Sequence, residues 1–333
     1  MKAELLKRLF KGIFSEDIVS LKKIAIKIIS DERELGHGKL ANSLEHISVT
    51  EKPRFSVLGE KHSNVNGNGI GVTSLPTSKR DNSQLVSFVP RELLKHHMVS
   101  PYDVEKRLQS IEKEYAAKER LGKYNLFPKK KILLHGAPGC GKTLSAERIA
   151  WNLGLPLLKV RFDALLSSYF GESASNLRAV FDYCKREPVV LLLDECDFIA
   201  KSRITAQQDV GEVPRIVNML LTLLDEYNAP GLVIATTNLK LTLDEALFRR
   251  FDDVIELPTP QIEEREKVLT MTLSAIPVDK SVNLRAIAEQ MDGYSYANIV
   301  LTAQRAAKCS VLTGNKIVEN AHFEQAIAEG SKF

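Results

Sequence analysis

The chain has 333 residues, of which 44% are hydrophobic and 26% charged, and its formal net charge is +4. This is an ordinary globular composition, long enough for two or three domains. Basic and acidic residues are interspersed, so the charge gives no argument for a nucleic-acid partner, and no apolar run approaches membrane-spanning length.

The first 47 residues are typical of a small helical bundle. Apolar side chains recur there at helical spacing, for example at Leu5, Leu9 and Ile13. So few residues cannot build a large core, and we expect residues 1–47 to dock a partner or a substrate. The N-terminus does not have the pattern of a signal peptide, and the four cysteines show no paired spacing. Both observations favour a cytoplasmic protein with reduced thiols.

The composition changes after this segment. Residues 62–83 are mostly Ser, Thr, Asn, Gly and Pro and cannot bury enough apolar surface to become ordered. We therefore expect residues 48–94 to form a flexible linker. A helix is predicted from about 101 to 121, immediately before the next change of pattern.

From residue 131 to 257 apolar strands alternate with helical patterns. The predicted strands are Ile132–His135, Leu157–Arg161, Val189–Leu193, Leu232–Thr236 and Val254–Glu256. This alternation predicts an α/β fold over residues 95–258, with a parallel sheet flanked by helices. Beyond Pro258-Thr259-Pro260 only helical patterns follow, at about 261–275, 283–291, 295–313 and 320–329. Residues 259–333 are thus expected to be all-helical.

A glycine-rich loop is the most informative motif of the chain. Residues 136–143 read Gly-Ala-Pro-Gly-Cys-Gly-Lys-Thr and fit the G-x-x-x-x-G-K-[ST] spacing of a phosphate-binding loop. A predicted strand precedes the loop and a predicted helix follows it, so backbone N–H groups and a helix N-terminus would face a polyphosphate. Lys142 would reach the terminal phosphates of a nucleoside triphosphate, and the Thr143 hydroxyl would hold Mg²⁺. The expected nucleotide contacts here are Pro138, Gly139, Cys140, Gly141, Lys142, Thr143 and Leu144.

Polar residues follow two of the predicted strands. Asp194 and Glu195 end the third strand, and the carboxyl ends of parallel strands are where such sheets bind ligands. Asp194 is predicted to hold Mg²⁺ through water, and Glu195 to polarise the water that attacks the γ-phosphate. Asn238 follows the next strand and could orient the same water. Each could instead be an ordinary turn residue, but the phosphate-binding loop favours catalysis.

Two further motifs indicate how such a site is completed and used. Arg249 and Arg250 lie between apolar residues before the last strand, and an arginine can neutralise the charge of phosphoryl transfer, sometimes from another subunit. A surface ion pair is the alternative. Tyr169 and Phe170 precede Gly171 and suit an exposed loop, although both rings could equally belong to a core.

Together these motifs resemble the AAA ATPases, the protein-remodelling branch of the AAA+ superfamily, over about residues 95–333. The resemblance implies a homo-oligomeric ring, commonly a hexamer, that hydrolyses ATP with Mg²⁺. It implies that Asn238 is the first sensor and that Arg249 or Arg250 reaches the ATP of a neighbouring subunit. Which of the two arginines is the main finger stays open.

The same resemblance implies how substrate and lid are engaged. Tyr169, Phe170 and Gly171 would form a pore loop that grips an unfolded polypeptide. Ala297 would contact the nucleotide from the helical region, which in this family is called the lid. The usual lid motif is Ser-Gly-Ala-Asp, whereas residues 295–298 read Ser-Tyr-Ala-Asn.

A narrower resemblance covers residues 22–47. This segment is similar to the N-terminal part of bacterial AAA ATPases that are encoded beside subtilisin-like serine proteases and are associated with phage defence. It implies a protein substrate and such a protease as partner. Two alternatives stay open. A nucleic-acid motor would need a basic, aromatic-rich surface, which is not evident. A nucleotide-controlled switch would activate a partner without translocation, although an intact Glu195 favours turnover.

Overall fold

The computed structural model describes residues 30, 33, 75–78, 82–166, 172–197, 212–238, 248–314 and 317–330. The chain divides into two compact units, Met1–Ile70 and Gly71–Phe333. Ser30 and Arg33 are helical, and the rest of the predicted bundle (1–47) lies outside the described residues. Within the described ranges, every helix is too short or too polar to cross a lipid bilayer.

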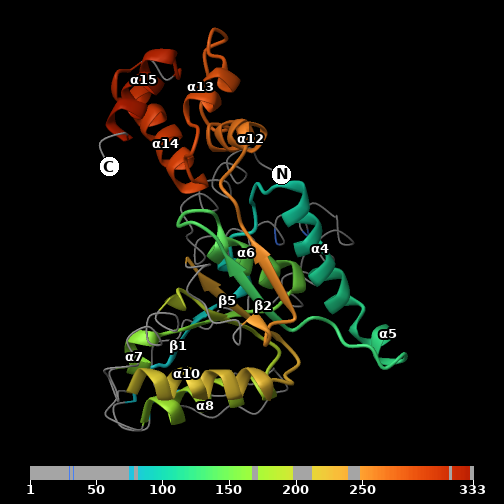
Figure 1. Cartoon of the computed structure of the whole chain (residues 1–333). Helices are drawn as coiled ribbons and strands as arrows, with labels where there is room; N and C mark the ends of the chain where they lie inside the picture. Colours follow the sequence, from blue (N-terminus) through green and yellow to red (C-terminus); the bar gives the residue numbers. More distant parts are fainter. Residues whose placement is uncertain are drawn as a thin grey trace. The chain divides into compact units, whose positions relative to one another are not determined.

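A six-stranded sheet forms the centre of the second unit (Figure 1). Its order is β1-β3-β4-β5-β2-β6, and all neighbouring strands are parallel except β1 and β3. The prediction of a parallel sheet flanked by helices is confirmed, and each of the five predicted strands differs from the observed one by a single residue. The strands are β1 (Val86–Val89), β2 (Lys131–His135), β3 (Leu157–Val160), β4 (Val190–Leu193), β5 (Leu232–Thr237) and β6 (Asp253–Glu256).

The edge strand β1 lies within the segment expected to be a flexible linker (48–94), and for this strand the prediction is wrong. Val86–Val89 pairs antiparallel with β3, so that Val86 lies opposite Val160 and Val89 opposite Leu157. Leu85 and Val86 are fully buried. The edge of β3 supplies the backbone partners and apolar contacts that offset the entropy cost of ordering this segment, which its own composition does not reveal.

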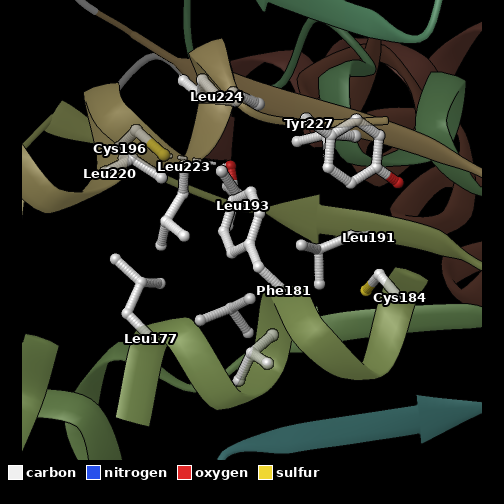
Figure 2. Close-up of a cluster of buried hydrophobic side chains, with 14 of the residues drawn as sticks. Leu177, Phe181, Cys184, Leu191, Leu193, Cys196, Leu220, Leu223, Leu224 and Tyr227 are labelled. Atoms are coloured by element: carbon white, nitrogen blue, oxygen red, sulfur yellow. Dashed lines mark hydrogen bonds between the residues drawn. The ribbon is translucent and has the colours of Figure 1, made fainter. Parts of the chain in front are cut away.

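Helices cover one face of the sheet through the apolar side chains that alternate along its strands. Leu191 and Leu193 of β4 belong to a buried cluster with helix α8 (Glu172–Arg186) and helix α10 (Glu212–Asp225). Figure 2 shows this layer, in which Phe181 of α8 lies beside the β4 leucines and edge-on to Tyr227 at a centroid distance of 5.9 Å. This packing holds β4, and with it the acids that follow, in the centre of the sheet.

The opposite face carries the helices nearest the candidate site. Ile132, Leu134 and Leu192 share a second buried cluster with helices α4 (Tyr102–Ala116) and α6 (Lys142–Leu153). The helix predicted over 101–121 is present but breaks at Ala117, after which a short helix begins. The short helices η1 (Arg91–Leu93) and α5 (Lys118–Gly122) lie in this region of the chain, whereas α7 (Phe162–Leu166) packs with α8 on the first face through Phe162 and Leu165.

The C-terminal region is helical, as predicted. Its four helices enclose a third buried cluster around Leu269, Ile299 and Phe323. Ser295 caps the helix that begins at Tyr296, because its hydroxyl accepts a hydrogen bond from the Asn298 N–H at 3.3 Å. The helices are α12 (Ile262–Thr272), α13 (Leu284–Gln290), α14 (Tyr296–Leu312) and α15 (Asn320–Gly330).

A partly buried ion pair joins α4 to α6, the helix that follows the glycine-rich loop. Arg148 donates two hydrogen bonds to the Glu105 carboxylate, at 2.5 and 2.6 Å. The arginine is 9% exposed. These bonds hold the pKa of Glu105 at about 2, although burial works in the opposite direction. Such a charge-assisted, bidentate pair fixes the angle at which α6 leaves the loop.

Glu105→Gln is expected to lower the free energy of unfolding by about 1 to 2 kcal/mol at pH 7. Because the folded pKa is depressed, Glu105 stabilises the fold fully above its unfolded pKa of 4.5, and the contribution is lost as the pH falls toward about 2. Urea unfolding of both proteins between pH 7 and pH 3 should therefore show the difference shrinking. The exposed Glu324→Gln is the control, and a difference that stays constant with pH would contradict this account.

Candidate functional site

The candidate site lies at the carboxyl ends of three adjacent strands. β5 is hydrogen-bonded to both β2 and β4, so the segments that follow these three strands meet at one edge of the sheet. A cavity of about 680 Å³ opens there, within the size range of small-molecule sites. It is lined by Pro138, Gly139, Gly141, Lys142, Thr143, Leu144, Asp194, Glu195, Thr236, Asn238, Tyr296, Ala297, Val300, Leu301 and Gln304.

The glycine-rich loop runs from the end of β2 to the first turn of α6. Gly139 has a φ of +77°, and a Cβ at this position would lie 2.6 Å from the Ser295 hydroxyl oxygen. Only glycine combines that backbone conformation with so close an approach. The Ala297 N–H donates to the Gly139 carbonyl at 3.1 Å, so the start of α14 is hydrogen-bonded to the loop. The N-terminus of α6, which favours anions, begins at the cavity wall with Lys142.

Lys142 is held among oxygen atoms at the base of the loop. Its ammonium donates to the carbonyls of Gly136 at 2.8 Å and Ala137 at 2.9 Å, and to Asn238 Oδ1 at 2.7 Å. Burial lowers the pKa of Lys142, and nearby acidic groups only partly offset this effect. A cation that is 8% exposed beside a cavity attracts an anion strongly, because little water screens its charge.

Thr143 and Asp194 form the part of the site that suits a divalent cation. The Thr143 hydroxyl lies 3.0 Å from Asp194 Oδ1, and the Thr236 hydroxyl donates to the same oxygen at 2.7 Å. Burial alone would raise the pKa of Asp194, but the Lys159 ammonium and the two threonine hydroxyls hold it below its ordinary value. One hydroxyl and one ionised carboxylate fit Mg²⁺, which keeps several waters and takes few protein ligands. They would hold it together with phosphate oxygens.

Glu195 occupies an unusual backbone position beside Asp194. Its φ is +56°, and its N–H donates to the Thr236 hydroxyl at 2.9 Å. A non-glycine residue in the left-handed region is strained, and such residues concentrate at functional sites. The side chain is exposed and lines the cavity. Its carboxylate is therefore accessible to a water molecule in the cavity, as the sequence interpretation requires.

Asp197 is a site residue that the sequence interpretation missed. It accepts hydrogen bonds from the Asn238 N–H and Nδ2, both at 2.8 Å, and from the Thr237 hydroxyl at 2.7 Å. Because the Asn238 amide nitrogen is held by Asp197, its oxygen faces Lys142. Burial opposes ionisation of Asp197, but these donors bring its pKa below the ordinary value. The run Asp-Glu-Cys-Asp at 194–197 is the sequence pattern that could have pointed to Asp197.

Arg249 and Arg250 do not line the cavity. They lie between Phe248 and Phe251, which pack against the buried cluster formed by β4, α8 and α10. Arg249 is exposed, whereas the Arg250 Nε donates to Asp225 Oδ2 at 3.0 Å. Neither arginine is therefore brought to the cavity of its own chain in this structure.

Three other expectations concern the surroundings of the site. Tyr169, Phe170 and Gly171 lie outside the described residues. Cys140 is buried rather than part of the cavity wall, and burial raises the pKa of its thiol. All four cysteines are free, as expected.

Comparisons with known proteins agree with these features. Residues 132–259 match the model of the "ATPase family associated with various cellular activities (AAA)". A protein of Sinorhizobium fredii (strain NBRC 101917 / NGR234), described as the "Uncharacterized AAA family ATPase y4kL", is 36% identical over 227 residues, which are 68% of this chain and 67% of that protein. The proteasome-activating nucleotidase of Methanosphaerula palustris is 33% identical over 229 residues, 67% of this chain and 56% of its own length.

Proposed function

Because the chain belongs to the AAA family of ATPases, we propose that it is a Mg²⁺-dependent motor that assembles into a ring and remodels protein substrates. The observation that carries the proposal is the cavity at the ends of β2, β4 and β5. It gathers a loop of the phosphate-binding type, a buried lysine, two acids and an amide within one space. These are the groups that binding and hydrolysis of a nucleoside triphosphate require.

Each group has a defined task in the proposed reaction. The loop N–H groups and the Lys142 ammonium bind the phosphates, with Lys142 exchanging its carbonyl acceptors for phosphate oxygens. Thr143 and Asp194 would hold Mg²⁺, which when bound neutralises phosphate charge. Glu195 takes a proton from the attacking water, because it is the exposed carboxylate on the cavity wall.

Two groups position rather than react. Asn238 presents a fixed amide to the attacking water and to the γ-phosphate, since Asp197 holds its nitrogen. Ala297 closes the cavity from the lid through its hydrogen bond to Gly139. Movement of α14 would change that contact, so nucleotide exchange and lid position are coupled in this proposal.

The site is completed by a neighbouring subunit. Arg249 and Arg250 are outside the cavity of their own chain, which supports a role toward the cavity of the next one. An arginine supplied in trans stabilises the charge that develops during phosphoryl transfer. Such a head-to-tail contact closes into a ring if its rotation permits, and we propose a hexamer.

Protein is the proposed substrate. The name of one relative, a proteasome-activating nucleotidase, concerns the activation of a protein-degrading complex. The aromatic residues Tyr169 and Phe170 would grip an unfolded polypeptide. The resemblance of residues 22–47 further supports a subtilisin-like serine protease as partner and a role in phage defence, and the four free cysteines support a cytoplasmic location. Residues 1–47 would dock that partner, and the part of the predicted linker (48–94) that precedes Leu75 would serve as the tether.

Tyr169→Ala tests the motor proposal against a nucleotide-controlled switch. Unfolded casein is expected to stimulate ATP turnover of the wild-type protein, because a translocating motor couples hydrolysis to a polypeptide in its pore. Tyr169→Ala should keep basal turnover within about twofold and lose the stimulation, since the loop touches substrate rather than nucleotide.

Tyr124→Ala, at a 79% exposed tyrosine, is the matched control and should behave like the wild type. Stimulation that survives in Tyr169→Ala would contradict the pore-loop assignment. A wild-type protein whose turnover ignores unfolded polypeptide would favour the switch.

A further inference from the structure

Lys159 lies on the sheet face that carries α6 and the glycine-rich loop. Leu157, two residues earlier on β3, belongs to the buried cluster of that face, and Lys159 is the exposed position of the strand. In the β3–β4 register Lys159 lies beside Leu192, and Asp194 follows two residues later. Since side chains two residues apart share a face, the lysine stem extends along β4 toward Asp194.

The Lys159 ammonium contacts Asp194 directly. Its Nζ lies 2.6 Å from Asp194 Oδ2, while the Thr236 hydroxyl bonds Oδ1 and the Thr143 hydroxyl lies within reach of both carboxylate oxygens. The carboxylate side chain is 8% exposed and the lysine side chain 46% exposed. A charge-assisted bond to so buried a carboxylate is stronger than an ordinary surface pair.

No second basic side chain pairs with Asp194 in the described part of the chain. Lys142, the other lysine of the site, instead donates to Gly136, Ala137 and Asn238. The charge partner of the proposed metal-holding carboxylate is thus a residue of β3 that plays no part in the phosphate-binding motif.

We propose that Lys159 competes with Mg²⁺ for Asp194 and thereby sets how much Mg²⁺ the site needs to bind nucleotide. This inference rests on the proposed function, because it takes Thr143 and Asp194 as the protein side chains that would hold Mg²⁺. Two cations that share one carboxylate repel each other, so either one weakens the hold of the other. Lys159 acts through Asp194 and is a positioning residue rather than a catalytic one.

The surroundings of Lys159 allow it to leave Asp194. A second cavity of about 270 Å³ adjoins the carboxylate and is lined by Ser87, Arg161, Asp163 and Glu195 in addition to Lys159 and Asp194. The flexible four-carbon stem of a lysine can swing into such a space. Glu195 and Asp163 offer the ammonium other carboxylates there, although Asp163 already pairs with Arg161 at 2.9 Å. Mg²⁺ therefore meets a competitor that can be displaced.

The test compares Lys159→Met with the wild type in a Mg²⁺ titration. Binding of a fluorescent, non-hydrolysable ATP analogue is followed as free Mg²⁺ is raised from an EDTA baseline. Lys159→Met, which keeps the length of the side chain without its charge, is expected to lower the midpoint for Mg²⁺ by about threefold or more. Lys159→Arg should keep the wild-type midpoint. Lys185→Met is the matched control, because Lys185 pairs with Asp182 at 2.9 Å and is 43% exposed.

Lys159→Gln repeats the neutral substitution if Lys159→Met folds poorly, which thermal melting will show. An unchanged or raised midpoint in a folded neutral variant overturns the inference while leaving the proposed function intact. A lowered midpoint in Lys185→Met also overturns it, since the effect would then be general charge. If the wild type does not bind the analogue at any Mg²⁺ concentration, the proposed function fails, and this inference fails with it.

Discussion

Glu195→Gln is expected to lower the turnover number for ATP at least about 100-fold while nucleotide affinity changes by less than about threefold. The amide has nearly the shape of the carboxylate but cannot take a proton from water. The side chain is exposed, and the contact that holds the strained backbone comes from the N–H to Thr236, which the substitution keeps. The loss should therefore fall on chemistry rather than on folding or binding.

Steady-state phosphate release and binding of a fluorescent ATP analogue separate these two effects. Light scattering after gel filtration should also show an assembled ring that persists in ATP, since the variant binds but does not turn over. Glu226→Gln, at an exposed glutamate beyond α10, is the control. Turnover within threefold of the wild type would remove Glu195 from its proposed role.

Lys142→Ala is expected to weaken ATP binding at least about 30-fold and to abolish measurable turnover. The ammonium donates to the carbonyls of Gly136 and Ala137 and to Asn238 Oδ1, so its removal also takes this donor from the Asn238 amide oxygen. Isothermal titration with a non-hydrolysable ATP analogue measures the loss of affinity. Lys267→Ala, an exposed lysine on α12, controls for the change in net charge. ATP affinity within threefold of the wild type would contradict the assignment.

The same variant tests whether sites are shared between subunits. Arg249→Ala and Arg250→Ala, combined in one protein, should be inactive alone because each site lacks its neighbour's arginine. Mixed at equal concentration with Lys142→Ala protein, about one quarter of randomly formed interfaces would unite an intact lysine with intact arginines. Turnover should then rise toward that fraction of the wild-type rate. A mixture that stays inactive at every ratio, although both proteins assemble, would show that the site is not shared.

Periodicity predicted the sheet because each strand is a short apolar run that is bounded by polar residues or turns. Ile132–His135 and Leu232–Thr236 could be read in this way because burial on both faces requires apolar residues throughout. The edge strand at Val86–Val89 could not, because one of its two sides has no strand neighbour and its pattern is too short to stand out. This strand forms only by pairing with β3, which lies about 70 residues further along the chain.

The residues that line the cavity could be predicted where their role depends only on neighbouring residues in the sequence. The glycine spacing, Lys142 and Thr143 lie within eight residues, and a strand that ends in two acids is visible without any contact information. Asp197 and Lys159 were not predictable in this way. An aspartate beside a turn and a lysine on a strand are common, and only their bonds to Asn238 and Asp194 give them a role.

The sequence by itself therefore determined the family, the five strands β2 to β6 and the groups proposed to contact phosphate, because these depend on neighbours along the chain. The tertiary structure decided which groups hold the site in shape. Asp197 orients Asn238, Lys159 pairs with Asp194, and Arg250 is bound to Asp225 away from its own cavity. These contacts join residues from separate strands and helices, or from separate turns beyond them. Hydrogen bonds and ion pairs depend on distances of a few ångströms, and those distances arise only when the sheet brings its strand ends together.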